Sequence, residues 1–260
     1  QALDTVLMPT QFQAQTIPSE YQHKCEIIHE GIDTETIKPI DDRYIKLKKA
    51  DLTLRKGDEI VSFVNRSLEP TRGFHVFMRA LPKLQKMRPN AQIIIVGSES
   101  VSYGQPPHGN SSWKEALLKE LDGELDLNKI HFVGKVEHSI LHDIFRVCSC
   151  HVYLTYPFVL SWRMLEAMSC EAVIIGSKTP PVEEVIEHQK NGLLVNFFDT
   201  EELASTIAQV LKYPQKYVQL SKKARKTIQE QYDLNQVCLP KLLKLVDRMT
   251  TKTKSSIKTA

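Results

Sequence analysis

The hydrophobic pattern alternates between short runs rich in valine and isoleucine and longer segments whose apolar residues recur every three or four positions. The runs predict buried strands and the longer segments predict amphipathic helices. Predicted strands span residues 60–64, 93–97, 130–134, 151–155, 173–177 and 192–196. Helices are predicted near residues 74–84, 113–121, 140–147, from 161 onward, and 182–187. Strands alternating with helices indicate an α/β fold, a doubly wound, Rossmann-like parallel sheet covered on both faces.

Four segments follow from the same pattern. Residues 1–57 form an entry segment with two strand-like runs, TVLMPT and CEIIHEGID, and then a charged stretch rich in lysine. Residues 58–213 form the Rossmann-like core, and residues 214–249 are predicted helices broken at prolines. Residues 250–260 carry lysines and no acid, which predicts a disordered, solvated tail. A weak association of this tail with a membrane surface is the alternative.

Composition places the chain among globular proteins. Its 260 residues are 42% hydrophobic and 25% charged, and the net charge of +3 leaves no basic field for a nucleic-acid partner. No apolar run reaches the roughly 20 residues that span a bilayer. The five cysteines lack the spacing of a disulfide framework, which predicts free thiols in a reducing, cytoplasmic compartment.

Glycines close several predicted strands, as in Val96-Gly97, Val133-Gly134 and Gly176-Ser177. In open α/β sheets ligands bind beyond the carboxyl ends of the strands, where glycine lets a ligand approach the backbone. The chain has no GxGxxG after its first core strand and no GxxxxGK[ST], which argues against a nicotinamide dehydrogenase and a P-loop nucleotidase.

Two arginines flank a turn at the end of the first core strand. Arg66 and Arg72 each offer a planar fork of donors, which suits a diphosphate, and Gly73 opens the following helix. The amino end of that helix adds unpaired N–H groups. The alternative is a solvated turn whose arginines pair with local carboxylates such as Glu69.

A second constellation follows the strand at 151–155. Ser161 is a predicted helix N-cap, and Glu166 lies on the second turn of the same helix. A carboxylate there is placed to accept hydrogen bonds from sugar or ribose hydroxyls. The alternative is a surface glutamate on an amphipathic helix.

Together these features resemble the C-terminal donor-binding domain of the GT-B glycosyltransferases, specifically glycosyltransferase family 4. The resemblance rests on six ordered pieces between about residues 5 and 235, and the phrase YPFVLSW is similar to a bacterial subgroup of the family. The pieces are Glu30-Gly31-Ile32-Asp33, Arg66, Arg72-Gly73, Ile95-Val96-Gly97, Ile130 to Val136, and Leu165-Glu166-Ala167-Met168.

The resemblance implies a role for each matching residue. Arg66 and Arg72 would hold the donor diphosphate and stabilise the leaving nucleoside diphosphate, and Glu166 would bind the ribose, so these three form the predicted catalytic set. The predicted donor-binding set is Gly73, Gly97, Lys135, Val136, Leu160, Ser161 and Trp162.

The implied activity is retaining transfer of a hexose from a UDP- or GDP-linked donor to a glycan, lipid or small molecule, without a metal or other cofactor. A GT-B enzyme has two Rossmann-like domains, and this chain is expected to begin at the hinge between them, without the acceptor-binding half. The alternative is a non-catalytic, degenerate module that binds nucleotide sugars or other partners.

The chain departs from the family pattern at three places. Phe158 replaces the first glutamate of the E-x7-E element, which contacts the transferred sugar, and Arg72 replaces a lysine one position later than usual. Glu171 stands where the family has a glycine, a substitution that strains the turn if φ is positive. Phe158 and Glu171 favour the non-catalytic alternative.

His138 and His142 have the i, i+4 spacing of a zinc-binding helix. The sequence offers no third ligand at a recognisable distance. An exposed polar helix face is therefore expected here, and no metal.

Overall fold

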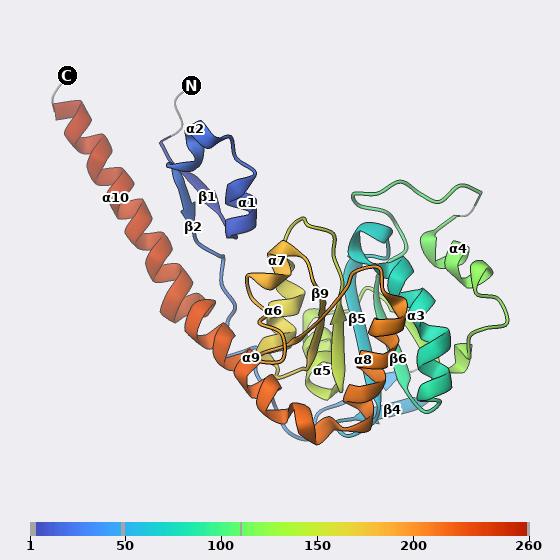
Figure 1. The fold of residues 1–260 in the computed structure, drawn as a ribbon. Coiled ribbons are helices and arrows are strands. Elements are labelled where there is room, and N and C mark those ends of the chain that lie inside the picture. The colour runs from blue at the N-terminus through green and yellow to red at the C-terminus, as the bar shows by residue number, and fades with distance from the viewer. Residues whose placement is uncertain (1–3, 48–49, 110, 259–260) are drawn as a thin grey trace.

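The centre of the molecule is a six-stranded parallel sheet of order β10-β9-β8-β5-β6-β7 (Figure 1). The computed structural model describes residues 4–47, 50–109 and 111–258. The six strands are β5 (Ile60–Ser67), β6 (Gln92–Ser98), β7 (Ile130–Gly134), β8 (Cys150–Tyr153), β9 (Ile174–Ser177) and β10 (Leu193–Val195). All six coincide with predicted strands to within three residues at either end. The predicted doubly wound α/β sheet is confirmed.

The order of the strands reverses beside β5. The chain runs outward through β6 and β7, returns to β8 on the other side of β5, and continues to β9 and β10. Such a switch point opens a crevice beyond the carboxyl ends of the two central strands. The crossovers contain α3 (Phe74–Met87), α4 (Trp113–Glu120), η3 (Leu127–Lys129), α5 (His138–Val147), α6 (Trp162–Ser169) and α7 (Pro180–Glu183).

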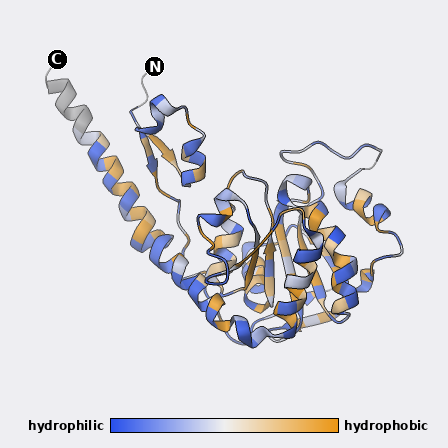
Figure 2. Cartoon of the chain, in the orientation of Figure 1, coloured by the Kyte–Doolittle hydropathy of each residue, from blue (hydrophilic) through white to orange (hydrophobic). Residues whose placement is uncertain are grey.

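Alternate residues of the strands feed two separate cores. Phe63 of β5 joins the core under α3, α4 and α8 (Thr200–Lys212), where its ring stacks on Phe77 at 4.5 Å. Its neighbour Val64 joins the opposite core, under α5, α6 and α9 (Val218–Gln231). Both faces of a strand are thus buried, and for this reason its sequence is continuously apolar rather than alternating. Figure 2 shows much of the central sheet in the colour of hydrophobic residues.

The entry segment consists of two small units. Its strands β1 (Val6–Met8) and β2 (Cys25–Ile27) pair in parallel, as two strand-like runs predicted, and the short helices α1 (Gln11–Gln15) and α2 (Ser19–Gln22) connect them. The lysine-rich stretch was not predicted to form strands, yet β3 (Tyr44–Leu47) and β4 (Leu52–Arg55) make an antiparallel hairpin. Only one residue of each strand is buried, so the hydrophobic signal was too weak to reveal the hairpin.

The C-terminal region is helical, with a break at Pro214 as predicted but none at Pro240, which lies in the first turn of the last helix. Pro214 opens the 3-10 turn η4 (Pro214–Tyr217), and a π-helical turn η5 (Leu234–Cys238) precedes the long helix α10 (Leu239–Lys258). Helix α10 leaves the sheet and runs beside the β1–β2 unit, where Arg248 forms an ion pair with Glu26 (Figure 1).

The prediction of a disordered tail from residue 250 is wrong as far as Lys258. Helix α10 continues to that residue, and TTKTKSSIK contains no glycine or proline that would interrupt it. Residues 259 and 260 lie outside the described part of the chain. No helix within the described residues has the length and apolar character to cross a bilayer.

Helix α6 ends in a Schellman motif with an unusual residue at its turning point. The N–H of Glu171 donates to the carbonyl of Met168, and the N–H of Ala172 donates to that of Ala167, each at 3.0 Å. This motif requires a left-handed residue, and Glu171 has a φ of 61°. The strain expected for a positive φ is therefore present at Glu171.

We expect Glu171→Gly to raise the free energy of unfolding by about 0.5–1 kcal/mol. Glycine adopts the left-handed conformation without the steric cost that a Cβ imposes, and part of this gain is offset by the greater freedom of glycine in the unfolded chain. Urea unfolding would measure the change. Glu171→Ala is the matched control, since it removes the carboxylate and keeps the Cβ. An equal gain in both variants would contradict the backbone explanation.

Candidate active site

A cavity of about 310 Å³ lies at the carboxyl ends of the central strands. It is bounded by the ends of β5 and β6 and by segments that follow β5, β7 and β8, so it occupies the switch point of the sheet. Its lining residues are Val64, Asn65, Arg66, Arg72, Val96, Gly97, Lys135, Val136, Leu141, Ser161 and Arg163. Four of these residues are cationic and none is acidic, which suits an anionic ligand.

The two predicted arginines face the same cavity from different positions. Arg66 is the last residue but one of β5 and is exposed, whereas Arg72 ends the 3-10 turn η2 (Pro70–Arg72) and is only 9% exposed. The alternative was that the arginines pair with local carboxylates such as Glu69. In the structure Glu69 instead accepts hydrogen bonds from the backbone of the loop at residues 102–104.

Two aromatic rings hold the guanidinium of Arg72. Its Cζ lies 5.5 Å from the ring centre of Tyr103 and 5.7 Å from that of Phe158, and the two rings meet edge to face at 4.9 Å. These cation–π contacts fix the orientation of the guanidinium and leave its charge available to a ligand. Phe158, which replaces the expected sugar-binding glutamate, is thus a support for Arg72.

Glu69 anchors the loop that supplies Tyr103. The carboxylate is buried and accepts hydrogen bonds from the backbone N–H groups of Ser102, Tyr103 and Gly104 at 3.0–3.2 Å, and from the Ser102 hydroxyl at 2.5 Å. Burial acts to raise the pKa of Glu69, and these hydrogen bonds outweigh it and lower the pKa below the ordinary 4.5. The loop over Arg72 is therefore tied to an ionised side chain.

We expect Glu69→Gln to destabilise the protein by about 1–3 kcal/mol at neutral pH, because a neutral amide replaces an acceptor of several hydrogen bonds. Since the folded-state pKa of Glu69 is lowered, its contribution is complete above the ordinary pKa of 4.5 and is lost as pH falls through the lower folded value. Urea unfolding from pH 7 to pH 3 would follow the difference between the variant and the parent. A difference that stays constant over this range would contradict an ionised anchor.

The amino end of α6 points its N-cap at the cavity. Ser161 caps the helix as predicted, since its hydroxyl accepts a hydrogen bond from the N–H of Arg163 at 3.2 Å. The N–H of Ser161 in turn donates to the hydroxyl of Tyr153 at 2.9 Å. Tyr153 is fully buried at the end of β8, so the strand positions the helix start directly.

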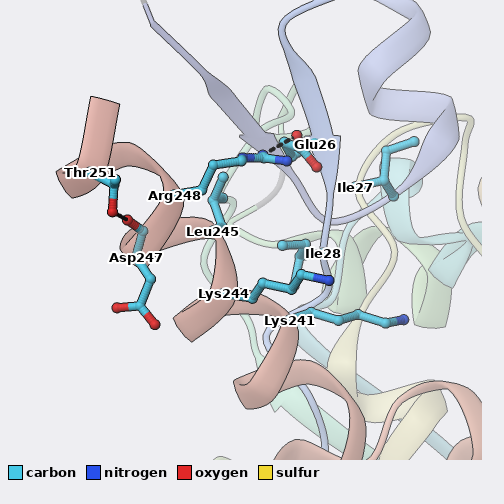
Figure 3. A pocket seen from close by; sticks show the side chains of 9 residues that line it. All are labelled: Glu26, Ile27, Ile28, Lys241, Lys244, Leu245, Asp247, Arg248 and Thr251. Atoms are coloured by element: carbon cyan, nitrogen blue, oxygen red, sulfur yellow. Dashed lines mark hydrogen bonds and ion pairs between the residues drawn. The ribbon is translucent and has the colours of Figure 1, made fainter. Parts of the chain in front are cut away.

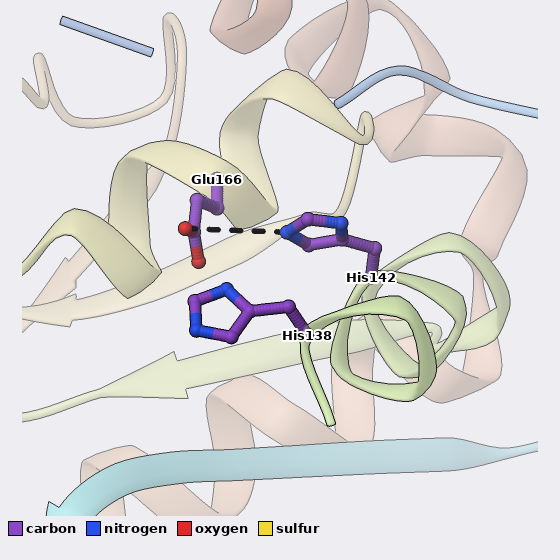
Figure 4. A group of neighbouring side chains, drawn as sticks. All are labelled: His138, His142 and Glu166. Atoms are coloured by element: carbon purple, nitrogen blue, oxygen red, sulfur yellow. Dashed lines mark ion pairs between the residues drawn. The ribbon is translucent and has the colours of Figure 1, made fainter. Parts of the chain in front are cut away.

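Glu166 lies one turn beyond, at the back of the site. Its carboxylate accepts a hydrogen bond from Arg163 at 2.7 Å, and its second oxygen is 4.0 Å from Nε2 of His142 (Figure 4). Burial acts to raise the pKa of Glu166, but contacts with His142 and Arg163 outweigh it and hold the pKa below 4.5. Glu166 is only 4% exposed, so it is not the surface glutamate of the alternative interpretation.

The structure brings most of the predicted residues together. Six of the predicted residues line the cavity: Arg66, Arg72, Gly97, Lys135, Val136 and Ser161. Glu166 does not line the cavity itself, but it is hydrogen-bonded to Arg163, which does. Gly73 and Leu160 are buried behind the lining residues, and the indole of Trp162 is half exposed and donates to Glu30 at 3.3 Å.

Three polar residues of the site were not predicted. Arg163 was recognisable from its i, i+3 spacing to Glu166. Nothing in the sequence pointed to Asn65, which lines the cavity and whose buried Nδ2 finds no partner among the described residues. His142 was considered for a metal only, and its proximity to Glu166 depends on the packing of α5 against α6.

A larger cavity of about 800 Å³ lies elsewhere, between β2 and α10 (Figure 3). Its walls combine three aliphatic side chains with charged residues of both signs, which are Glu26, Lys241, Lys244, Asp247 and Arg248. It is remote from the carboxyl ends of the sheet, where ligands of this fold bind. We therefore place the candidate site at the smaller cavity.

Comparisons with known proteins identify the family of the chain. The family model described as glycosyl transferases group 1 matches residues 45–227, and a second, described as glycosyl transferase family 4 group, matches residues 1–37. The D-inositol 3-phosphate glycosyltransferase of Mycolicibacterium vanbaalenii is 26% identical over 216 residues, which cover 81% of this chain and 46% of that protein. The chain thus spans less than half the length of this curated relative.

Solved structures show the same fold. Sucrose-phosphate synthase from Thermosynechococcus elongatus superposes with a TM-score of 0.74 at 21% identity, over 96% of this chain and 59% of that one. HepE from Anabaena superposes with a TM-score of 0.69 at 18% identity, over 97% and 63% of the two chains. Because the first family model covers well over half of the residues, the chain belongs to the group 1 glycosyl transferases, with a GT-B type of fold.

Proposed function

We propose that this chain forms the donor-binding part of a glycosyltransferase that transfers a hexose, with retention of anomeric configuration, from a nucleoside diphosphate sugar. The observation that carries the proposal is the cavity at the switch point, which combines two arginines, a helix N-terminus and the unpartnered amide of Asn65. A buried donor without a partner is costly, and a phosphate oxygen in the cavity would satisfy it.

The proposed roles follow from position. Arg72, held between two rings, and Arg66, at the exposed rim, would bind the diphosphate and stabilise the charge that develops on it as the glycosidic bond breaks. Cationic side chains would thus supply the charge stabilisation, and no metal or other cofactor is assigned to this step. The N–H groups at the start of α6 would add to this field.

Glu166 would accept hydrogen bonds from the ribose hydroxyls, and Lys135 and Val136 would flank the base. The lowered pKa of Glu166 keeps it ionised and therefore a strong acceptor. Among related folds, HepE was crystallised with UDP and glucose and with UDP-glucose, which makes UDP the first nucleotide to test. GDP is the alternative, and the acceptor is unassigned.

A thermal-shift screen with UDP, GDP, ADP and their sugars tests the proposal. A ligand present at ten to a hundred times its Kd should add about 1.4–2.7 kcal/mol to the free energy of unfolding. We expect UDP and its sugars to raise the Tm of the chain. If none of the nucleotides does so at millimolar concentration, the proposed donor site is refuted.

A non-catalytic module that binds nucleotides is the second candidate, and Phe158 favours it. In the family this position carries a carboxylate that contacts the sugar, and here an apolar ring packs against Arg72. The two candidates differ in whether the sugar adds affinity. Equal Kd values for UDP and every UDP-sugar, together with no cleavage of the UDP-sugars to free UDP, would favour the non-catalytic module.

A further inference from the structure

We propose that His138, His142 and Glu166 form a binding site for a transition-metal ion, of which zinc is the best match, and that metal bound there competes with the nucleotide donor. Two histidines and one carboxylate are a known ligand set for zinc. The sequence showed only the two histidines, and the fold supplies the third ligand from the neighbouring helix.

The three ligands converge in space (Figure 4). His138 and His142 occupy successive turns of α5 and turn their rings toward the carboxylate of Glu166 on α6. One ligand atom of each residue lies within 4.8 Å of the others. Ligands of tetrahedral zinc are roughly 3.3 Å apart, given zinc–nitrogen distances of about 2.0–2.1 Å. His138 is exposed, so rotation of its side chain can close much of the difference.

An unpartnered nitrogen points to a ligand. Nε2 of His142 is buried and has no hydrogen-bond partner among the described residues, and it lies 4.0 Å from Oε1 of Glu166. The other oxygen, Oε2, is engaged by Arg163. A metal ion between Nε2 and Oε1 would satisfy both atoms without displacing Arg163. Buried polar atoms normally have partners, so this gap suits an ion.

The competition with donor follows from the shared carboxylate. A bound cation would engage Oε1 of Glu166 and so take up a carboxylate oxygen that ribose hydroxyls would need as an acceptor. This consequence rests on the proposed function, because it needs Glu166 to bind ribose, whereas metal binding itself does not. Zinc would then lower the affinity for UDP by regulation rather than take part in the transfer.

The three buried cysteines at the ends of α5 and α6 and at the start of β8 are poor competitors for the metal. Burial raises the pKa of Cys148 and of Cys170 to about 12, and the pKa of Cys150 is raised as well, so their thiolate forms are scarce at neutral pH. Cobalt bound through thiolates also shows a charge-transfer absorption in the near ultraviolet. That absorption separates cysteine binding from the proposed histidine–glutamate site.

Metal titration of the untagged chain tests the site directly. We expect calorimetry to show one zinc ion per chain, and Co²⁺ to give visible absorption without the thiolate band. His138→Ala and His142→Ala should each weaken zinc binding at least roughly tenfold. His23→Ala, which removes an exposed histidine of the entry segment, is the matched control and should bind as the parent does.

Loss of affinity in the control as large as in His138→Ala would overturn the site, as would a thiolate band or the absence of binding. Since His138 is exposed, its substitution should leave the fold intact even if His142→Ala does not fold.

A second titration measures the competition, with the Kd of UDP determined in EDTA and at a zinc concentration that fills the site of the parent but not the weakened site of His138→Ala. Zinc also binds UDP in solution, and His138→Ala corrects for this because it shares that effect while its site stays largely empty. We expect zinc to raise the Kd about tenfold more in the parent than in the variant. Equal changes would overturn the competition. Failure of UDP to bind in EDTA would refute the proposed donor site, while the cobalt result would still decide the metal site.

Discussion

Arg72→Ala should weaken the binding of UDP roughly 30- to 150-fold and leave the affinity for uridine unchanged. The guanidinium is nearly buried and is held over the cavity by Tyr103 and Phe158. Hydrogen bonds to charged groups contribute about 1.5–3 kcal/mol each, and a loss of about 2–3 kcal/mol corresponds to this range of Kd. Calorimetric titration of the parent and the variant with both ligands would measure the effect.

The matched control is Arg79→Ala. Arg79 lies on α3 a short distance along the chain, is half exposed, and pairs with Glu120 through two hydrogen bonds of 2.6 and 2.9 Å. Its removal takes away the same charge and should leave UDP binding unchanged apart from a small long-range effect that salt screens. Equal losses of UDP and uridine affinity in Arg72→Ala would contradict the phosphate role and indicate a collapsed site instead.

Gly73→Ala should lower the free energy of unfolding by about 2–5 kcal/mol. Gly73 joins η2 to α3 with a φ of 70°, and a Cβ there would lie 2.2 Å from the Cβ of Leu154. The left-handed backbone costs an alanine about 1–2 kcal/mol, and the steric overlap with a buried side chain adds about 1–3 kcal/mol. Because the clash is with the first side-chain carbon of Leu154, rotation of that side chain cannot relieve it. Urea unfolding would measure the loss.

Gly123→Ala separates the two contributions. Gly123 has a nearly equal φ of 74°, but no atom lies within 4 Å of the position its Cβ would take. We expect it to cost only the backbone part, about 1–2 kcal/mol. Equal losses in the two variants would show that the close packing of the η2–α3 turn against β8 contributes nothing.

The effect of Gly73 also concerns the site. The same turn carries Arg72, so the approach of Gly73 to Leu154 places the guanidinium beside the carboxyl end of β8. The sequence shows that a glycine precedes the helix, but it does not show that Gly73 packs against Leu154 across the switch point. The variant is therefore expected to lose UDP affinity together with stability.

The order of the elements and the type of fold could be predicted from the sequence because they depend on local pattern. Strands buried on both faces need continuous apolar runs, and the central strand β6 contains such a run in Ile93 to Val96. The same holds for Ser161, because an N-cap acts on N–H groups two or three residues away. The β3–β4 hairpin was missed because its strands bury too few residues to leave a pattern.

The tertiary structure alone decided which side chains meet. Glu69, considered as a partner of the arginines, bonds the backbone of residues 102–104 more than thirty positions away. Phe158 was interpreted from the sequence as the loss of a sugar-binding carboxylate, and in the structure its ring contacts Arg72. His142 on α5 faces Glu166 on the neighbouring helix α6. A sequence records the chemistry of each residue and its near neighbours, but distances between segments arise from the packing of helices on the sheet. For that reason the arginines and the helix start were predictable as parts, and the cavity they share was not.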